Sequence, residues 1–250
     1  MPIVEAYRDD LAYIHDTGYG AMAEEAARRL IGELAQAGRR HGVVVDLGCG
    51  SGILAHRLIE AGYQVVGVDV SDAMVALARK RAPTAQFRVG SFVSADLPPS
   101  LAVTAIGEVL NYGFDSANSE AARADLFQRV YEALVPGGLL LFDVAGLERA
   151  RPGGPHRTFA AGTDWAVLVE TDFTPATRVL TRAITSFRQV GNLYRRDDEV
   201  HRLALVDPVA MLESLRTIGF DVQAIPSYGA LSLPPGVAAF LCRKPMAARA

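Results

Sequence analysis

The stretch VVVDLGCGSG, residues 43–52, places a carboxylate, Asp46, just before three closely spaced glycines, Gly48, Gly50 and Gly52. A glycine turn after an apolar run lets backbone N–H groups approach a ligand, as in the dinucleotide fingerprint G-x-G-x-x-G. Here the third glycine comes one residue early, and Asp46 would repel a pyrophosphate group. The pattern therefore favours a positively charged, phosphate-free ligand over a dinucleotide.

A second acid, Asp69, ends the next apolar run, YQVVGVDV. An acid at this position accepts hydrogen bonds from the two hydroxyl groups of a ribose. S-adenosylmethionine has a ribose, which suits Asp69, and it has an ammonium group and a sulfonium group, which the negative charge of Asp46 would attract. Asp69 alone does not separate this ligand from NAD, and an NAD(P)-dependent oxidoreductase stays open as an alternative.

Strands and helices must alternate to bring these residues together. Crossovers of helical length give a parallel, right-handed, doubly wound sheet. Apolar runs predict strands at 43–46, 63–69, 87–89, 101–106 and 139–144, and helical periodicity with caps predicts helices at 21–38, 53–62, 72–82 and 120–135.

The alternation of strands and helices ends after Val144. Residues 146–162 are rich in glycine, proline and arginine and are interpreted as a loop, whereas 165–173, 179–189 and 193–205 alternate like strands joined by short turns. We expect an inserted antiparallel meander. Asp207 before Pro208 predicts the start of a helix, and two last strands follow at 220–225 and 237–242.

Five motifs in this order resemble those of the class I S-adenosylmethionine-dependent methyltransferases. They are VVVDLGCGSG, YQVVGVDVSDAMV, FRVGSF, TAIGEVLNY and LVPGGLLLFDV. The resemblance implies a Rossmann-like α/β fold: a doubly wound, mostly parallel seven-stranded sheet with an antiparallel last strand, plus a small antiparallel β insertion after strand five. It implies a core at 41–145 and 206–245, an N-terminal helical lid at 1–40, and an insertion at 146–205 that covers the acceptor site.

The resemblance also assigns cofactor-binding residues by position. Two departures from the family pattern stand out: Ser91 replaces a common acid, and Leu101 replaces an aspartate. The implied set comprises Asp46, Gly48 and Gly50 at the methionine end, Asp69 at the ribose, Val70, Gly90, Ser91 and Phe92 around the adenine, Gly107 and Glu108 near the sulfonium, and Tyr13 in the lid.

Methyl transfer from a sulfonium is an in-line displacement, so the protein chiefly aligns the acceptor and excludes water. A nearby histidine or carboxylate helps to remove a proton from an amine or alcohol acceptor. The candidate catalytic residues are His15 and Tyr19 in the segment YIHDTGYG, Asn111 in EVLNYG and His201 in DDEVHR.

The composition of the chain limits the classes of molecule that it is expected to bind. The formal charge of -3 argues against a nucleic-acid partner, and no motif of DNA amino-methylases or cytosine methylases is present. Two cysteines give neither a disulfide framework nor a zinc site, so no metal is expected. We expect a cytoplasmic protein that acts on a small molecule, does not bind membranes, and has the capacity to form a homodimer. The insertion resembles that of small-molecule N-methyltransferases, including those for nucleotide-linked amino sugars. A cofactor-binding regulator without turnover is the other alternative.

Overall fold

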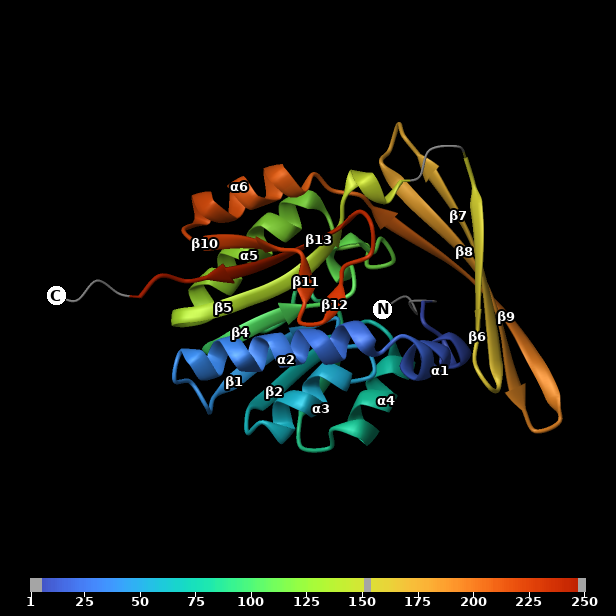
Figure 1. Cartoon of the computed structure of the whole chain (residues 1–250), viewed down its shortest axis with the longest axis horizontal. Coiled ribbons are helices and arrows are strands. Elements are labelled where there is room, and N and C mark those ends of the chain that lie inside the picture. Colours follow the sequence, from blue (N-terminus) through green and yellow to red (C-terminus); the bar gives the residue numbers. More distant parts are fainter. Residues whose placement is uncertain (1–5, 151–153, 247–250) are drawn as a thin grey trace.

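The computed structural model describes residues 6–150 and 154–246. A seven-stranded sheet with helices on both faces forms one end of the molecule, and a separate four-stranded sheet stands at the other end (Figure 1). This arrangement confirms the predicted fold class. Within the described residues, no helix has both the length and the apolar character needed to span a bilayer.

The main sheet has the strand order β10-β13-β5-β4-β1-β2-β3. All neighbouring pairs are parallel except those of β13, which runs antiparallel to β5 and β10. The carboxyl ends of β1, β2 and β4 therefore meet at one edge, where ligands bind in open α/β sheets. The strands are β1 (Val43–Leu47), β2 (Gln64–Asp69), β3 (Gln86–Val89), β4 (Ser100–Ala105), β5 (Leu134–Ala145), β10 (Asp221–Ile225) and β13 (Val237–Arg243).

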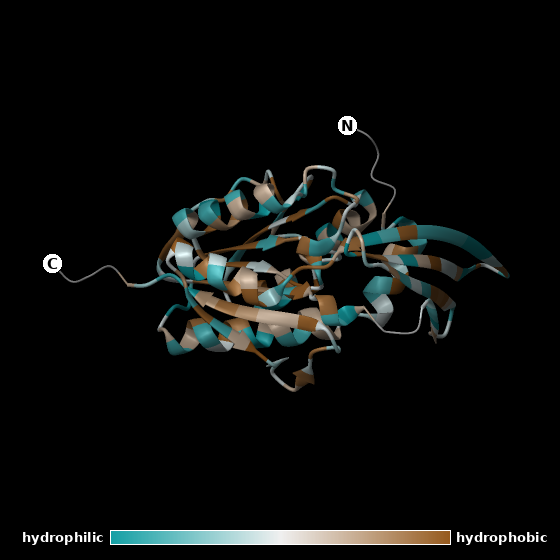
Figure 2. Cartoon of the chain, turned by 90° about the horizontal axis from the view of Figure 1, so that it is seen from above, coloured by the Kyte–Doolittle hydropathy of each residue, from teal (hydrophilic) through white to brown (hydrophobic). Residues whose placement is uncertain are grey.

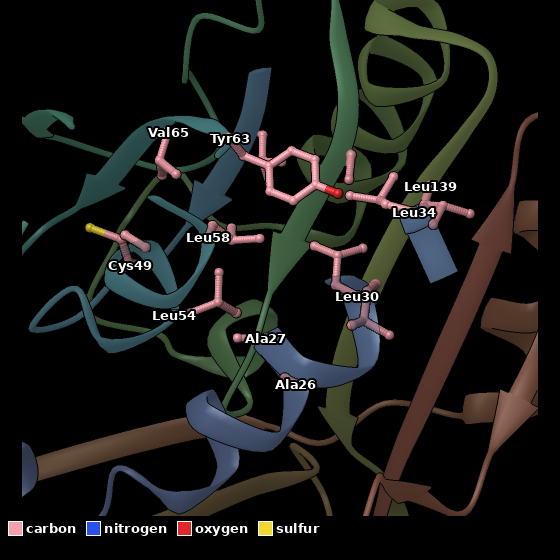
Figure 3. Close-up of a cluster of buried hydrophobic side chains, with 14 of the residues drawn as sticks. Ala26, Ala27, Leu30, Leu34, Cys49, Leu54, Leu58, Tyr63, Val65 and Leu139 are labelled. Atoms are coloured by element: carbon pink, nitrogen blue, oxygen red, sulfur yellow. The ribbon is translucent and has the colours of Figure 1, made fainter. Parts of the chain in front are cut away.

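Successive residues of each central strand face opposite helical layers, because side chains alternate along a strand. Val44 joins the apolar cluster under α2, α3 and α4, and Val45 joins the cluster under α5 and α6. Figure 3 shows the first cluster, in which side chains of α2 and α3 converge on the sheet. The helices are α2 (Ala21–Gln36), α3 (Ile53–Glu60), α4 (Asp72–Arg81), α5 (Glu120–Ala133) and α6 (Pro208–Ile218).

Two predicted helix starts are confirmed by their caps. The hydroxyl oxygen of Ser71 accepts a hydrogen bond of 3.1 Å from the N–H of Met74 at the start of α4. Asp207 accepts bonds from Val209 and Ala210 at the start of α6. A side-chain cap of this kind stabilises a helix by about 1 kcal/mol. The cap at Ser71 also fixes where β2 passes into α4, next to Asp69.

The inserted sheet has the order β6-β7-β8-β9, and every pair in it is antiparallel. Its inner face packs on α1 (Asp9–Gly18) through Leu11, Ile14, Val167 and Ile184. In the hydropathy view, the strands of this sheet carry many hydrophilic residues, whereas the strands of the main sheet are mostly hydrophobic (Figure 2). Its strands are β6 (His156–Ala161), β7 (Trp165–Thr174), β8 (Val179–Val190) and β9 (Leu193–Ala204).

The loop prediction for 146–162 is wrong for its second half, because His156–Ala161 forms the edge strand β6. Most β6 side chains are exposed, so the sequence lacks the alternating pattern that marks a half-buried strand. Backbone pairing with β7 holds this strand in place. The helical segment expected at 1–40 consists, within the described residues, of two helices with different neighbours: α1 contacts the inserted sheet, and α2 packs against α3.

Candidate active site

Two adjoining cavities open at the carboxyl edge of the main sheet. The smaller one, of about 100 Å³, lies over the ends of β1, β2 and β3. The larger one, of about 490 Å³, lies between this edge, α1 and the inserted sheet. The cavities share a wall made of Tyr7, His15, Ile106, Gly107 and Tyr112. The two cavities are therefore direct neighbours on either side of these five residues.

The glycine turn after β1 forms the floor of the smaller cavity. Gly48, Gly50 and Gly52 all have positive φ, at 66°, 51° and 76°. A Cβ on Gly48 would lie 2.5 Å from a methyl carbon of Val109, and one on Gly52 would lie 2.9 Å from the Cα of Ala78. A Cβ on Gly50 would meet nothing within 4 Å. Gly48 and Gly52 are therefore required by packing, whereas Gly50 leaves space in the cavity for a ligand.

Asp69 lines the smaller cavity and also holds the turn. Its Oδ2 accepts a 2.8 Å hydrogen bond from the N–H of Gly50, and its Oδ1 accepts a 2.9 Å bond from the N–H of Ser71. Burial raises the pKa of Asp69, and the backbone hydrogen bonds oppose that rise. A carboxylate held in this way keeps lone pairs available for the hydroxyl groups of a ribose.

The far end of the smaller cavity is lined by Val70, Gly90 and Phe92, and by Met74 and Asp115, which the sequence analysis did not single out. The predicted cofactor residue Ser91 is not among the described lining residues. Its hydroxyl group instead donates a short hydrogen bond to Oδ2 of Asp115 and accepts one from the N–H of Val93. After β3, Ser91 stands where many relatives have an acid. Asp115, in the loop after β4, supplies a carboxylate to the same region of the cavity.

Asp46 does not line either cavity in the described structure. It is 2 % exposed, and its Oδ1 accepts a 2.7 Å hydrogen bond from the hydroxyl group of Thr104 on β4. Burial raises its pKa to about 7. The prediction that Asp46 contacts the ligand at the pocket mouth is therefore not supported, because the carboxyl group is buried against β4 and lines neither cavity.

The turn after β4 is shaped by Asp143, a buried residue of β5. Its carboxylate accepts hydrogen bonds from the N–H groups of Gly107 and Glu108, at 2.9 and 2.6 Å, and one from the hydroxyl group of Tyr228 at 3.0 Å. Burial raises the pKa of Asp143 to about 6. The sequence analysis missed this residue, which looks like part of an apolar strand. Gly107 lines both cavities, and Glu108 lines the larger one.

His15 lies at the junction of the two cavities. Its ring forms an edge contact with Tyr7 and stacks on Tyr19, with centroid distances of 5.3 and 5.9 Å. The buried Nδ1 atom has no hydrogen-bond partner among the described residues. Burial lowers the pKa of His15 to about 4, so the ring is neutral at pH 7. Tyr19, which is 45 % exposed, lines the larger cavity only.

Three further predicted site residues have structural contacts instead. Asn111 is fully buried, donates to the carbonyl groups of Ala145 and Ala204, and accepts from the N–H of Ala145. The hydroxyl group of Tyr13 donates to Asp164, and the ring of Tyr13 packs under the guanidinium of Arg188. Neither residue is among those that line the cavities. We therefore remove Asn111 from the catalytic candidates and Tyr13 from the cofactor-binding ones.

His201 is the third such residue, and it lies one layer behind the cavity wall. It is 1 % exposed, and its Nε2 lies 2.9 Å from Oε2 of Glu199. The same carboxylate accepts hydrogen bonds from the backbone N–H groups of Tyr7 and Arg8, at 2.7 and 2.9 Å. His201 thus supports the segment that carries Tyr7 and does not itself reach a cavity, which argues against the catalytic role predicted for it.

Tyr7 is held from three sides. Besides the bond to Glu199, its carbonyl oxygen accepts a 2.8 Å bond from the hydroxyl group of Ser71, and its hydroxyl group lies 2.8 Å from that of Tyr112. These contacts join β9, the start of α4 and the turn after β4. The wall between the two cavities is therefore built from segments that are far apart in the sequence.

Comparisons with known proteins identify the family of the chain and its fold. Residues 44–138 match the family profile described as "Methyltransferase domain". A protein of Geobacillus sp. (strain WCH70) named "Putative methyltransferase" is 36% identical over 189 residues, which span 73% of this chain and 75% of the relative. A trans-aconitate 2-methyltransferase of Acidovorax sp. (strain JS42) is 36% identical over 116 residues, 46% of this chain and 42% of its own. The solved structure of an S-adenosylmethionine-bound amino pentose methyltransferase from Micromonospora echinaspora has a TM-score of 0.72 at 18% identity, covering 93% of this chain and 95% of its own.

Proposed function

Because this chain belongs to the class I S-adenosylmethionine-dependent methyltransferase family, we propose that it methylates a nitrogen or oxygen atom of a small molecule bound in the larger cavity. The observation that carries this proposal is the wall shared by the two cavities, with His15 at their junction. A small acceptor fits the larger cavity, because small-molecule sites span about 300–1,000 Å³.

The open space beside Gly50 and the carboxylate of Asp69 fit S-adenosylmethionine. When bound, this cofactor supplies a methyl group on a positively charged sulfur. We assign Gly48 and Gly50 to its methionine end, Asp69 to the ribose hydroxyl groups, and Gly107 to the sulfonium side. We assign Val70, Gly90 and Phe92 to the adenine faces and Asp115 to its amino group, because a carboxylate accepts a hydrogen bond from that donor.

His15 would orient the acceptor. A lone pair of the acceptor forms the new bond to the methyl carbon, while the electron pair of the carbon–sulfur bond stays on sulfur. The acceptor N–H or O–H donates to the neutral imidazole of His15, which lines both cavities, and this bond aims the acceptor lone pair at the methyl group. A neutral imidazole suits this position, because an imidazolium would repel the nearby sulfonium.

The proposal also assigns a role to each segment of the chain. Residues 41–145 and 206–245 bind the cofactor, residues 146–205 cover the acceptor, and the N-terminal helical segment within 1–40 closes both cavities. The names of the relatives, a trans-aconitate methyltransferase and an amino pentose methyltransferase, support a small-molecule acceptor. We also propose a cytoplasmic location and the capacity to form a homodimer, without nucleic-acid or membrane partners.

Incubation of the purified chain with methyl-labelled S-adenosylmethionine and a panel of small amines, alcohols and acids tests the function. We expect acceptor-dependent S-adenosylhomocysteine and a labelled acceptor. His15→Gln should lower kcat for that acceptor at least about tenfold while leaving the affinity for S-adenosylhomocysteine within about threefold. His56→Gln is the matched control, because the side chain of His56 is 41% exposed and lines neither cavity. Tight cofactor binding without transfer to any acceptor would instead favour a regulator.

A further inference from the structure

A partly buried cluster of three charges lies on the wall of the larger cavity. Glu108 accepts a 2.9 Å hydrogen bond from Nε of Arg149 at Oε1 and a 2.7 Å bond from Nη2 of Arg182 at Oε2. The side chains of Arg149 and Arg182 are only 24% and 17% exposed. Glu108 is the only carboxylate among the described residues that line this cavity. The lining therefore carries one net positive charge when the histidines are neutral.

A single arginine would be enough to neutralise Glu108, so the second one needs another explanation. Each guanidinium has five N–H donors, and those bonded among the described residues are a minority. Apart from Glu108, Arg149 donates to the carbonyl group of Pro235 at 3.3 Å and Arg182 to the hydroxyl group of Tyr112 at 3.5 Å, both of them long contacts. A partly buried guanidinium with remaining donors is suited to bidentate binding of an anion.

We propose that Arg149 and Arg182 bind an anionic oxygen group of the methyl acceptor, a carboxylate or a phosphate. This inference rests on the proposed function and names the substrate class of the same site. Both arginines line only the larger cavity, whereas His15 lines both cavities. An anion held by the arginines thus leaves another part of the acceptor to reach His15 at the junction.

The charge of the cavity supports this choice over a cationic acceptor. A protonated amine would face two guanidinium groups, and the sulfonium of the bound cofactor adds positive charge at the junction. An anionic acceptor compensates for that charge instead. The competing role for the arginines is to bind the carboxylate of the methionine moiety of the cofactor, and the two roles differ in a measurable way.

The test uses the full chain saturated with S-adenosylhomocysteine and titrated calorimetrically with succinate, trans-aconitate, trimethyl trans-aconitate and uridine diphosphate. We expect binding of a free carboxylate or of the diphosphate, and none of the trimethyl ester. Preference for the carboxylates or for the diphosphate identifies which anion the site takes. Arg149→Gln should weaken that binding at least about tenfold, and Arg149→Lys should restore part of it. Arg157→Gln is the control, because the side chain of Arg157 is 84% exposed and lines neither cavity.

The inference is overturned if none of these anions binds, or if Arg149→Gln binds them as tightly as the wild type does. A matching loss of affinity for S-adenosylhomocysteine in Arg149→Gln would also overturn it, because the arginine would then serve the cofactor. Efficient turnover of an acceptor that lacks any anionic group would reject the inference and leave the proposed function intact. Absence of cofactor binding in the wild type would reject both.

Discussion

Replacement of Gly50 by alanine separates ligand binding from folding in the glycine turn. Gly50 has a φ of 51°, and a Cβ there would meet no protein atom within 4 Å. The left-handed conformation costs a non-glycine residue roughly 1–2 kcal/mol. For a chain of this size, that cost lowers Tm by about 2–8 °C. The added methyl group enters the space assigned to the cofactor, where overpacking costs about 1–3 kcal/mol, roughly 5- to 150-fold in affinity.

Gly52→Ala is the matched control, since Gly52 has a similar φ of 76° but a Cβ there meets the backbone of α4 at 2.9 Å. We expect a larger fall in Tm than for Gly50→Ala and an almost unchanged affinity of the folded protein for S-adenosylhomocysteine. Differential scanning calorimetry and isothermal titration calorimetry measure the two quantities. If Gly50→Ala binds S-adenosylhomocysteine as tightly as the wild type does, the cofactor does not lie over this turn and the assignment fails.

Four more substitutions probe the site. Asp69→Ala should weaken binding of S-adenosylhomocysteine by about 1–3 kcal/mol in calorimetry, and an unchanged Kd would exclude Asp69 from the site. Asp115→Ala should abolish any preference for S-adenosylhomocysteine over S-inosylhomocysteine, which lacks the amino group; a preserved preference counts against the role of Asp115. Burial raises the pKa of Asp46 to about 7, so the folded chain keeps a proton that the unfolded chain loses between about pH 4 and 7, and the free energy of unfolding falls as pH rises through that range. In urea denaturation at pH 5 and 8, Asp46→Asn should show a smaller fall than the wild type, because the part due to Asp46 is removed and the part due to Asp143 stays, and it should keep its cofactor affinity. Asn111→Ala should destabilise the fold by about 3 kcal/mol, because the N–H of Ala145 and the carbonyl groups of Ala145 and Ala204 lose their bonds to Asn111, while KM for the cofactor stays the same.

The main sheet was predictable because its strands are short apolar runs that end in glycine turns or acids. Val43–Leu47 illustrates this, since burial on both faces of a parallel sheet demands a continuous apolar segment. The edge strand His156–Ala161 has no such signal, because its place depends on backbone pairing to a neighbour and not on burial of its side chains.

The site was less predictable than the fold, because motif positions do not fix the direction of side chains. Asn111 and Tyr13 are polar residues on the expected elements, yet their side chains are engaged in contacts away from the cavities. Asp115 lies in a loop without a motif and reaches the cavity only through the path of the chain after β4. Glu108 binds Arg149 and Arg182, which lie 41 and 74 positions after it in the sequence. Contacts over such separations are set by the tertiary fold.

The wall shared by the two cavities has a consequence for inhibitor design. Since Tyr7 and Tyr112 border both compartments, one molecule with an adenosyl end and an acidic end could occupy them together without a long spacer. Tethering makes the second contact intramolecular, so such a bisubstrate compound should bind far more tightly than either fragment alone.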